Sequence, residues 1–392
     1  MVSPSLTFGR AGLTLAQMKL GFDIRPFLKE ETGVGIYFKN LLFHLSRLDT
    51  ENEYFLFTSS WKDRFAEEKI PPFRRLHFHD YRLPVKMINY LWYRLGHPRL
   101  DRFFKEPLDL THSPTPLPLP TAGKKVVTVY DLFFLDFPDQ ADRQARQVFY
   151  RKIRPSLQQA DAVVTISDFT RNQILDRFAV DPARVHTIHL GLDREFWVER
   201  GEETGEELRN RLNLPDAFLL FVGAHEKRKN ITGLLDALKI IHSRKGKLPL
   251  VLAGRSGEGS HDVRKKAEAL GLASSLIFTG YCDERELRCL YRMADILVYP
   301  SLWEGFGLPL LEAMASGLPV AASRRTAIPE IAGDAALYFN PENPEDMADQ
   351  IIRGIEQTEL RKGLIGRGLE RAERFSWART AEQSLALYRG LV

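Results

Sequence analysis

Short apolar runs alternate along the chain with longer amphipathic stretches, and this pattern predicts strands followed by helices. The runs are rich in Val, Ile, Leu and Phe, as is typical of strands buried on both faces of a parallel sheet. In the first half, we expect strands at 19–24, 54–58, 125–130, 161–166 and 185–189. In the second half, we expect strands at 218–222, 249–253, 276–279, 296–299 and 320–322.

The amphipathic stretches between these runs predict helices that cover both faces of a sheet. Ser167 and Asp168 stand where a helix N-cap belongs, ahead of a helix that extends to Phe178. The alternation predicts an α/β fold whose crossovers are right-handed and whose strands are parallel. The other helices that we expect lie at 36–48, 230–244, 261–270, 285–293 and 308–315.

A polar stretch at 199–207 interrupts the alternation and divides the chain into two doubly wound halves. We expect a disordered leader at 1–17, a Rossmann-like domain at 18–200 and a second Rossmann-like domain at 201–377. Ligands of such sheets bind outside the carboxyl ends of the strands. Two facing halves therefore predict one cleft between them, with the chemistry at the strand ends.

Composition is that of an ordinary globular protein, with 44% hydrophobic and 27% charged residues in 392. The net charge of +4 is too small to indicate a nucleic-acid partner. No apolar run is long enough to cross a bilayer, and the first residues lack the pattern of a signal peptide. Cys282 and Cys289 form no metal-ligand pattern. We therefore expect a cytoplasmic protein.

The segment 300–312 reads Pro-Ser-Leu-Trp-Glu-Gly-Phe-Gly-Leu-Pro-Leu-Leu-Glu and follows an expected strand. Gly305 and Gly307 bracket Phe306 and allow a ligand to approach the backbone closely. Pro309 suits the first turn of a helix, where its missing N–H has no intrahelical partner to lose. The free N–H groups and the positive dipole end of that turn suit a phosphate.

Two carboxylates stand on either side of this turn, Glu304 in the loop and Glu312 one turn into the helix. Each can accept hydrogen bonds from a pair of hydroxyl groups, one pair on a hexose and the other on a ribose. The plain alternative is a strand–loop–helix connection with glutamates that face solvent. The combination of Gly-Phe-Gly, Pro and two glutamates favours a ligand site.

This segment and its continuation, Ala-Met-Ala-Ser-Gly-x-Pro-Val, resemble the E-x7-E region of retaining glycosyltransferases of family 4. The likeness extends from about Lys19 to the C-terminus and is strongest over 218–341. It implies the GT-B fold, in which two Rossmann-like, doubly wound domains face each other across a cleft. The first domain would bind the acceptor and the second the nucleotide sugar, with a last helix at 378–392 that packs back on the first domain.

The resemblance also implies a role for each residue of the motif. Glu304 would contact the transferred sugar, and Glu312 would bind the ribose hydroxyls. The amides near Phe306, Gly307 and Leu308 would face the diphosphate and the sugar.

A basic loop begins at Gly223, between an expected strand and helix. Its Arg228 and Lys229 can reach a phosphate in the cleft, Arg as a fork and Lys as a point charge. With Asn230, they resemble the pair of cations that binds the diphosphate in the family. Some relatives have an additional Arg where Ala224 stands, so the charge falls on Arg228 and Lys229. Taken alone, a basic loop is usually a solvated turn.

Two further positions are assigned to the donor through the resemblance. The loop 32–37 contains Gly33 and Gly35 but lacks the full G-x-G-x-x-G fingerprint. In the family the corresponding loop approaches the donor phosphates. Tyr281 follows an expected strand, where the family often places the nucleobase.

Tyr130 and Asp131 follow the strand at 125–130, at a position where many relatives have His-Asp. The tyrosine cannot perform a role that requires an imidazole, but we expect the pair to bind the acceptor. The open alternative is that Tyr130 packs in the core and Asp131 caps the following turn.

The sequence contains neither Asp-x-Asp nor a His/Cys ligand cluster, so we expect a reaction without metal or separate cofactor. Arg228, Lys229 and the helix start near Gly307 would offset the charge of the departing nucleoside diphosphate. The resemblance implies retention of configuration. The sequence places no carboxylate at the anomeric carbon. Our hypothesis is therefore a same-face substitution in which the leaving phosphate accepts the acceptor's proton.

The segment 74–105 combines eight Lys and Arg residues with two acidic residues and several aromatic ones. Such a surface can bind anionic lipid headgroups, which would place the protein peripherally on the inner face of the membrane. The alternative is a helical insertion whose aromatic residues belong to the core. The aromatic residues in question are Tyr90, Trp92, Tyr93, Phe103 and Phe104.

The likeness over 218–341 favours mannosyltransferases that use GDP-mannose in polysaccharide or lipopolysaccharide assembly, with UDP-sugars as the next donors. We therefore expect hexosyl transfer to a glycan or a lipid-linked acceptor. Two other functions remain open. A nucleotide-sugar epimerase would need an acid/base pair around the sugar ring. A non-catalytic sugar-nucleotide-binding protein would not need Arg228, Lys229 and Glu304 together.

Overall fold

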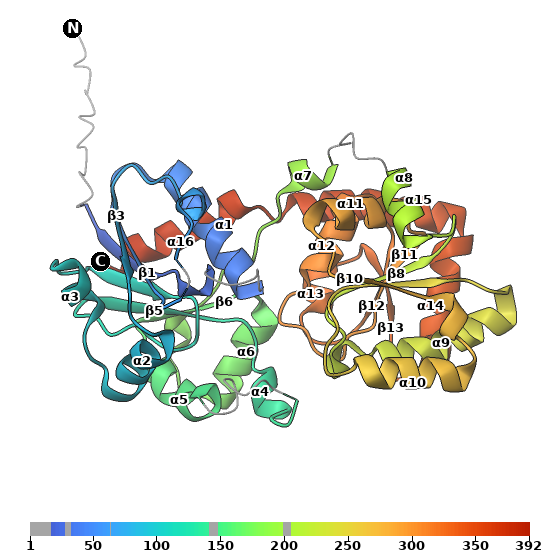
Figure 1. Ribbon diagram of the computed structural model, residues 1–392, viewed down its shortest axis with the longest axis horizontal. Coiled ribbons are helices and arrows are strands. Elements are labelled where there is room, and N and C mark those ends of the chain that lie inside the picture. Colours follow the sequence, from blue (N-terminus) through green and yellow to red (C-terminus); the bar gives the residue numbers. More distant parts are fainter. Residues whose placement is uncertain (1–16, 28–32, 63, 141–147, 199–204) are drawn as a thin grey trace, which may run out of the picture.

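The computed structural model describes residues 17–27, 33–62, 64–140, 148–198 and 205–392. Two lobes lie side by side, and each has a sheet with helices on both faces (Figure 1). The expected leader at 1–17 lies almost wholly outside the described residues, as does most of the polar stretch at 199–207.

Both sheets are parallel throughout, as the alternation of strands and helices predicts. The N-terminal lobe has seven strands in the order β3-β2-β1-β4-β5-β6-β7, and the C-terminal lobe has six in the order β10-β9-β8-β11-β12-β13. The N-terminal strands are β1 Lys19–Asp23, β2 Glu53–Ser59, β3 Leu76–Tyr81, β4 Leu110–Ser113, β5 Lys124–Val129, β6 Ala162–Thr165 and β7 Val185–Thr187. The C-terminal strands are β8 Leu219–Val222, β9 Leu250–Ala253, β10 Leu276–Gly280, β11 Ile296–Tyr299, β12 Val320–Ser323 and β13 Ala336–Phe339.

Helices cover both faces of each sheet (Figure 1). Those of the N-terminal lobe are α1 Gly33–Leu48, α2 Val85–Tyr90, α3 Leu100–Phe104, α4 Phe133–Asp136, α5 Tyr150–Gln159 and α6 Asp168–Arg177. The next helix, α7 Arg194–Val198, packs on the C-terminal lobe (Figure 1). Those that follow are α8 Gly205–Leu212, α9 Ile231–Lys245, α10 Ser260–Leu270, α11 Glu284–Met293, α12 Leu308–Ala315, α13 Ile328–Ala332, α14 Pro344–Glu356, α15 Thr358–Glu373 and α16 Trp377–Leu391.

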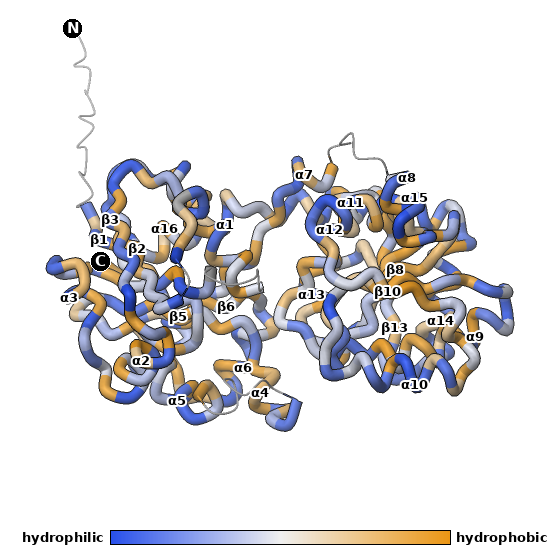
Figure 2. Tube along the Cα trace, viewed as in Figure 1, coloured by the Kyte–Doolittle hydropathy of each residue, from blue (hydrophilic) through white to orange (hydrophobic). Residues whose placement is uncertain are grey.

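The central strands are apolar along their whole length because helices bury both of their faces. Strands β8, β9 and β11 are buried at every residue. Figure 2 shows the same arrangement, with hydrophobic residues gathered around β8 and hydrophilic ones on the outer turns. This packing fixes the carboxyl ends of the strands, from which the loops of the site emerge.

The last helix, α16, returns to the N-terminal lobe and packs against α1 (Figure 1). Its Tyr388 is buried and donates or accepts a hydrogen bond at 2.6 Å with Nδ1 of His112 on β4. On its way, the chain runs beside the segment that leaves the N-terminal lobe: Leu192 bridges Ser376, and a Cβ on Gly191 would lie 2.1 Å from the backbone N of Trp377. The two crossovers between the lobes are therefore in contact.

One sequence prediction about the first lobe is wrong. Gly33 and Gly35 lie in the first turn of α1 and not in a loop before it, while Thr32 lies outside the described residues. Glycine lowers helix propensity but does not forbid a helix. The buried side chains of Tyr37 and Leu41 recur at helical spacing, so packing against the sheet extends the helix to Gly33.

The segment 74–105 forms β3, α2 and α3, so its aromatic residues divide between the core and the surface. Trp92 is buried beside Phe57 of the sheet and Phe104 beside Phe55, as the core alternative predicts. Tyr90 is 57% exposed. No helix within the described ranges has the length and apolar character needed to cross a bilayer.

Candidate active site

The loop between β11 and α12 turns sharply into the helix at Gly307, whose φ is +114°. A Cβ there would lie 2.9 Å from Cδ1 of Leu310, so glycine is required by both conformation and space. Pro309 stands in the first turn of α12, as the sequence predicts. The amino end of this helix therefore has free backbone N–H groups next to a loop that can approach a ligand.

Glu304, in the same loop, accepts hydrogen bonds from two cations of the basic loop. Oε1 lies 2.6 Å from Nζ of Lys229, and Oε2 lies 3.3 Å from Nη1 of Arg228. The side chains of Glu304 and Lys229 are 8% and 9% exposed. Burial alone would raise the pKa of Glu304, but the charges of Lys229 and Arg228 outweigh it and lower the pKa to about 2. Glu304 is therefore ionised at any physiological pH and holds both cations in place.

The position of the two cations follows from a tight turn after β8. Asn230 has φ +54°, which ends the short 3-10 turn at Lys227–Lys229, and its Nδ2 donates to the carbonyl of Pro341 at 2.8 Å. The backbone N of Leu302 donates to the carbonyl of Arg228 at 2.8 Å. These bonds join the basic loop to the loop before α12, so their charged groups meet.

Glu312, one turn into α12, is half-buried near the amino end of the helix. Its Oε2 accepts a hydrogen bond of 2.8 Å from the hydroxyl of Tyr291 on α11. Burial raises the pKa of Glu312 to about 7, against the opposing effect of Tyr291 and with a small contribution from Glu284. A carboxyl group of this kind ionises readily when further hydrogen-bond donors reach it.

The N-terminal lobe touches this site through the residues that follow β5. A Cβ on Gly305 would lie 2.3 Å from the carbonyl oxygen of Tyr130 and 3.0 Å from Cβ of Asp131. The half-buried Asp131 accepts a hydrogen bond of 3.0 Å from the backbone N of Phe133, and the loss of solvent around its carboxyl raises its pKa. The ring of Tyr130 packs edge-on against Tyr37, 5.8 Å between centroids. The structure thus shows the contacts of the alternative interpretation, in which Tyr130 packs in the core and Asp131 caps the following turn.

Trp303 inserts between the lobes and was missed by the sequence analysis. Its ring centroid lies 6.1, 5.7 and 5.6 Å from those of Phe133, Phe137 and Phe169, all in the N-terminal lobe. The only signal for this role in the sequence is an aromatic residue directly before Glu304. The cluster buries apolar surface across the cleft and holds the lobes together.

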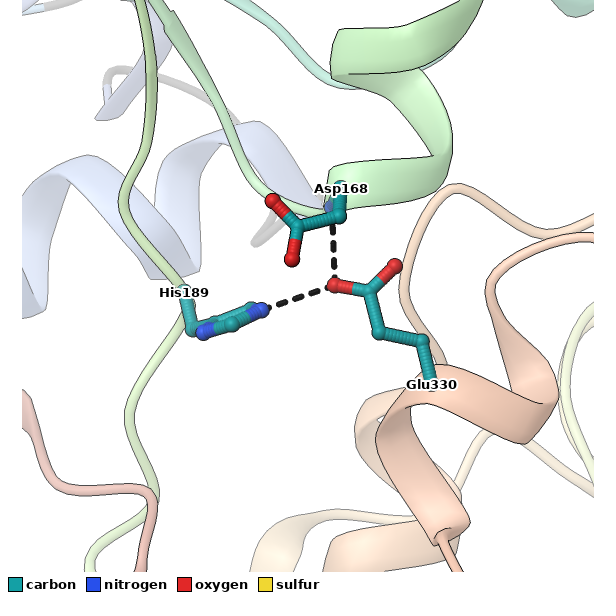
Figure 3. A group of neighbouring side chains, drawn as sticks. All are labelled: Asp168, His189 and Glu330. Carbon is teal, nitrogen blue, oxygen red and sulfur yellow. Dashed lines mark hydrogen bonds and ion pairs between the residues drawn. The ribbon is translucent and has the colours of Figure 1, made fainter.

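Glu330 forms a second contact between the lobes (Figure 3). Its carboxylate accepts from the backbone N of Asp168 at 2.7 Å, from that of Phe169 at 2.9 Å and from Nε2 of His189 at 2.8 Å. A residue of α13 thereby caps the amino end of α6 in the other lobe. The ligand atoms of Asp168, His189 and Glu330 lie within 4.8 Å of one another, a spacing that a metal ion could also use. No sequence motif indicates this contact, because Glu330 and Asp168 are 162 residues apart.

The remaining expected donor residues lie around the same strand ends. Gly223 follows β8 with φ +147°, and Lys229 packs beside it. Phe306 is buried against Phe375 at 5.9 Å, so its side chain faces away from a ligand. Tyr281 follows β10 and is 57% exposed, with the guanidinium of Arg255 4.5 Å from the centre of its ring.

Leu308 begins α12, beside Gly307. Gly33 and Gly35 lie in the first turn of α1, and Tyr37 of the same helix contacts Tyr130.

Two family models match the chain. Residues 205–371 match the model described as "Glycosyl transferases group 1", and residues 32–196 match "Glycosyltransferase Family 4". Together, the two models cover most of both lobes, and the first of them includes the whole of the Glu304–Glu312 region.

Among curated proteins, the chain is similar to O-antigen chain mannosyltransferase B of Escherichia coli. The two are 29% identical over 383 residues, which cover 95% of this chain and 100% of that protein. The chain is also 32% identical over 241 residues to serotype-specific mannosyltransferase WbdA of Escherichia coli. That match covers 60% of this chain and 30% of that protein.

Solved structures share the fold. Sucrose-phosphate synthase from Thermosynechococcus elongatus aligns with a TM-score of 0.72 and 21% identity over 96% of this chain and 99% of that one. HepE from Anabaena, in complex with UDP-glucose, aligns with a TM-score of 0.74 and 16% identity over 96% and 100% of the respective chains. The predicted architecture of two facing Rossmann-like lobes is confirmed.

Proposed function

Because this chain is a group 1 glycosyltransferase of family 4 with the GT-B fold, we propose that it transfers mannose from GDP-mannose to a glycan or a lipid-linked acceptor in polysaccharide or lipopolysaccharide synthesis, with retention of configuration. The observation that carries the proposal is the group of Arg228, Lys229 and Glu304 beside the amino end of α12. The choice of mannose rests on the two relatives that are named as mannosyltransferases.

In this proposal, the diphosphate of the donor binds at the amino end of α12, next to Arg228 and Lys229. Arg228 retains exposed surface, 23% of its side chain, from which its guanidinium can form bonds to phosphate oxygens. Glu304 holds both cations before the donor arrives, so little reorganisation accompanies charge development on the leaving group. When the glycosidic bond to the diphosphate breaks, these cations and the helix amides stabilise the nucleoside diphosphate.

Glu304 and Glu312 have separate roles in this arrangement. Glu304 accepts hydrogen bonds from the transferred hexose, and Glu312 accepts them from the ribose. The acceptor hydroxyl attacks from the face that the diphosphate leaves, and the leaving phosphate oxygen takes its proton. On the other side of the cleft, Asp131, whose Cβ would lie 3.0 Å from a Cβ on Gly305, would orient the acceptor, with Tyr130 next to it.

A panel of nucleotide sugars tests the donor. GDP-mannose is expected to raise the melting temperature most, and GDP release is expected when a lipid-linked glycan acceptor is added. A larger shift with a UDP-sugar would overturn the choice of donor but leave hexosyl transfer in place. No shift with any nucleotide sugar would overturn the assignment of the site.

We also propose that the outward side of α2 and the turn after it rests on a membrane that carries the acceptor. Tyr90 and Leu95 are 57% and 56% exposed, and Met87 is 41% exposed. All eight Lys and Arg residues of 74–105 are exposed, so anionic headgroups would meet positive charge around an apolar patch. The chain is expected to float with phosphatidylglycerol vesicles and not with phosphatidylcholine vesicles. Absence of flotation with both would contradict the proposal.

A further inference from the structure

A pocket of about 210 Å³ lies where the two crossovers between the lobes meet. His189, from the segment after β7, lines one side. Arg371 and Arg374, at the end of α15, and Arg379, in the first turn of α16, line the others. The pocket is thus built from both lobes, and it lies outside the group formed by Arg228, Lys229 and Glu304.

The charged side chains that line this pocket are all basic. No Asp or Glu lines it. Within the part of the chain that the structure describes, no carboxylate oxygen comes within 4.0 Å of Arg374 or Arg379. Arg371 is held in place by the backbone, with Nε 2.9 Å from the carbonyl oxygen of Ile331 and Nη2 bonded to that of Glu330. Burial and the positive charge of Arg374 lower the pKa of Arg371, against the opposing effect of Asp334 and Glu330.

The position of Arg379 is a second indication that this pocket suits an anion. The first turn of α16 contains no acidic residue, and Arg379 stands at the positive end of the helix dipole. A cation there costs stability unless an anion lies nearby. The cap of the helix is otherwise complete, since Oγ of Ser376 accepts a hydrogen bond of 3.2 Å from the backbone N of Arg379.

We propose that this pocket binds a phosphoryl group, either as inorganic phosphate or as the phosphate of a small ester. Guanidinium groups hold phosphate oxygens in pairs, and two or three arginines around one anion match this chemistry. The volume is below the range of pockets for drug-sized ligands, which favours a small anion. This site is separate from the donor site of the proposed function.

Occupancy of the pocket would act on the arrangement of the lobes. Phe375, which lines the pocket, packs against Phe306 of the donor loop, 5.9 Å between centroids. His189 at its edge bonds to Glu330, which caps α6 (Figure 3). A phosphoryl group between α15 and α16 would therefore stabilise the contact between the crossovers. Only the packed rings of Phe375 and Phe306 would separate it from the donor loop.

The test is a titration of the full chain with inorganic phosphate at constant ionic strength, followed by thermal unfolding. A phosphate concentration about ten times the Kd favours the folded state roughly elevenfold, which appears as an upward shift of the melting temperature. Arg374→Ala and Arg379→Ala are each expected to weaken phosphate binding roughly tenfold or more. Arg379→Ala is also expected to raise the melting temperature without phosphate, because it removes a cation from the helix start.

Two matched variants make the result decisive. Arg389→Ala removes an exposed arginine from the far end of the same helix and is expected to bind phosphate as the wild type does. Lys229→Ala changes the donor site and is expected to retain the phosphate shift. A shift lost in Lys229→Ala but kept in Arg374→Ala and Arg379→Ala would place the phosphate in the donor site and overturn the proposal. Absence of a shift in the wild type would overturn it as well.

Glycerol phosphate, titrated in parallel, distinguishes the two sources of the phosphoryl group. Tighter binding than inorganic phosphate would support a phosphate ester as the ligand. Weaker binding, with the inorganic phosphate shift present, would support free phosphate.

Discussion

Replacement of Glu312 by Gln is expected to change how the free energy of unfolding depends on pH. Burial raises the pKa of Glu312 to about 7, from an ordinary value of 4.5. Below about pH 4.5 the carboxyl is protonated in both the folded and unfolded chains, so it adds no pH-dependent cost. Between about pH 4.5 and 7 the unfolded chain ionises first, and the folded state loses roughly 3 kcal/mol relative to it. The cost then stays constant at higher pH.

Glutamine keeps the shape of Glu312 and an oxygen that can accept from Tyr291, but it does not ionise. The stability of Glu312→Gln relative to the wild type is therefore expected to rise by roughly 3 kcal/mol between about pH 4.5 and pH 8. Denaturant unfolding at a series of pH values measures this difference. Equal pH dependence in the two proteins would refute the burial argument.

Donor binding gives the functional half of the same prediction. Ribose hydroxyls donate to the carboxylate, so binding favours the ionised form and releases a proton. The Kd of a nucleotide sugar is expected to be roughly tenfold lower at about pH 8 than at about pH 6, because only the ionised fraction binds. The diphosphate of the donor has no terminal phosphate, so its own charge is constant over this range.

Calorimetric titration at several pH values measures the Kd, and two variants serve as controls. In Glu312→Gln the affinity is expected to be weaker and independent of pH. Tyr291→Phe removes the hydrogen bond that lowers the pKa of Glu312, so the midpoint of the affinity curve is expected to move to higher pH. A Kd of the wild type that does not change with pH would refute the role given to Glu312.

Three other predictions concern the contacts that assemble the site. Gly305→Ala would place a Cβ 2.3 Å from the carbonyl oxygen of Tyr130, so kcat/KM is expected to fall at least roughly tenfold in transfer assays with little change in melting temperature. Gly366→Ala, where a Cβ meets nothing within 4 Å, is the control and is expected to be fully active. Lys229→Gln leaves the buried Glu304 with Arg228 as its remaining cation and is expected to cost about 3 kcal/mol in denaturant unfolding. Lys229→Gln/Glu304→Gln should regain most of that stability but not transfer; a double variant as unstable as the single one would contradict the pairing. Glu330→Gln weakens the cap of α6 and is expected to increase the radius of gyration in X-ray scattering, whereas an unchanged radius would show that this contact does not hold the lobes.

The sequence predicts features whose cause is local. Gly307 and Pro309 place a helix start after a strand because each restricts the backbone at its own position, and the structure has α12 begin between them at Leu308. Ser167 caps α6 as expected, accepting from the backbone N of Thr170. Strands β8 to β12 of the C-terminal lobe were also predicted correctly, because each is a short apolar run between helical stretches.

Features that depend on distant residues could not be predicted in this way. The bond between Lys229 and Glu304 joins residues 75 apart, and only the fold brings them within 2.6 Å. Strands β3, β4 and β13 were missed, since β3 alternates polar and apolar residues and β4 reads Leu-Thr-His-Ser. Gly33 was assigned to a loop because the propensity of one residue was given more weight than the packing of the whole helix.

The central claim is that a sugar nucleotide binds with its diphosphate at the amino end of α12, beside Arg228 and Lys229. A crystal structure of the chain with GDP-mannose tests it most directly. The account predicts phosphate oxygens within hydrogen-bond distance of Nζ of Lys229 and of the backbone N–H groups at Gly307 and Leu308, with the ribose on Glu312. A nucleotide bound anywhere else on the two lobes would contradict it.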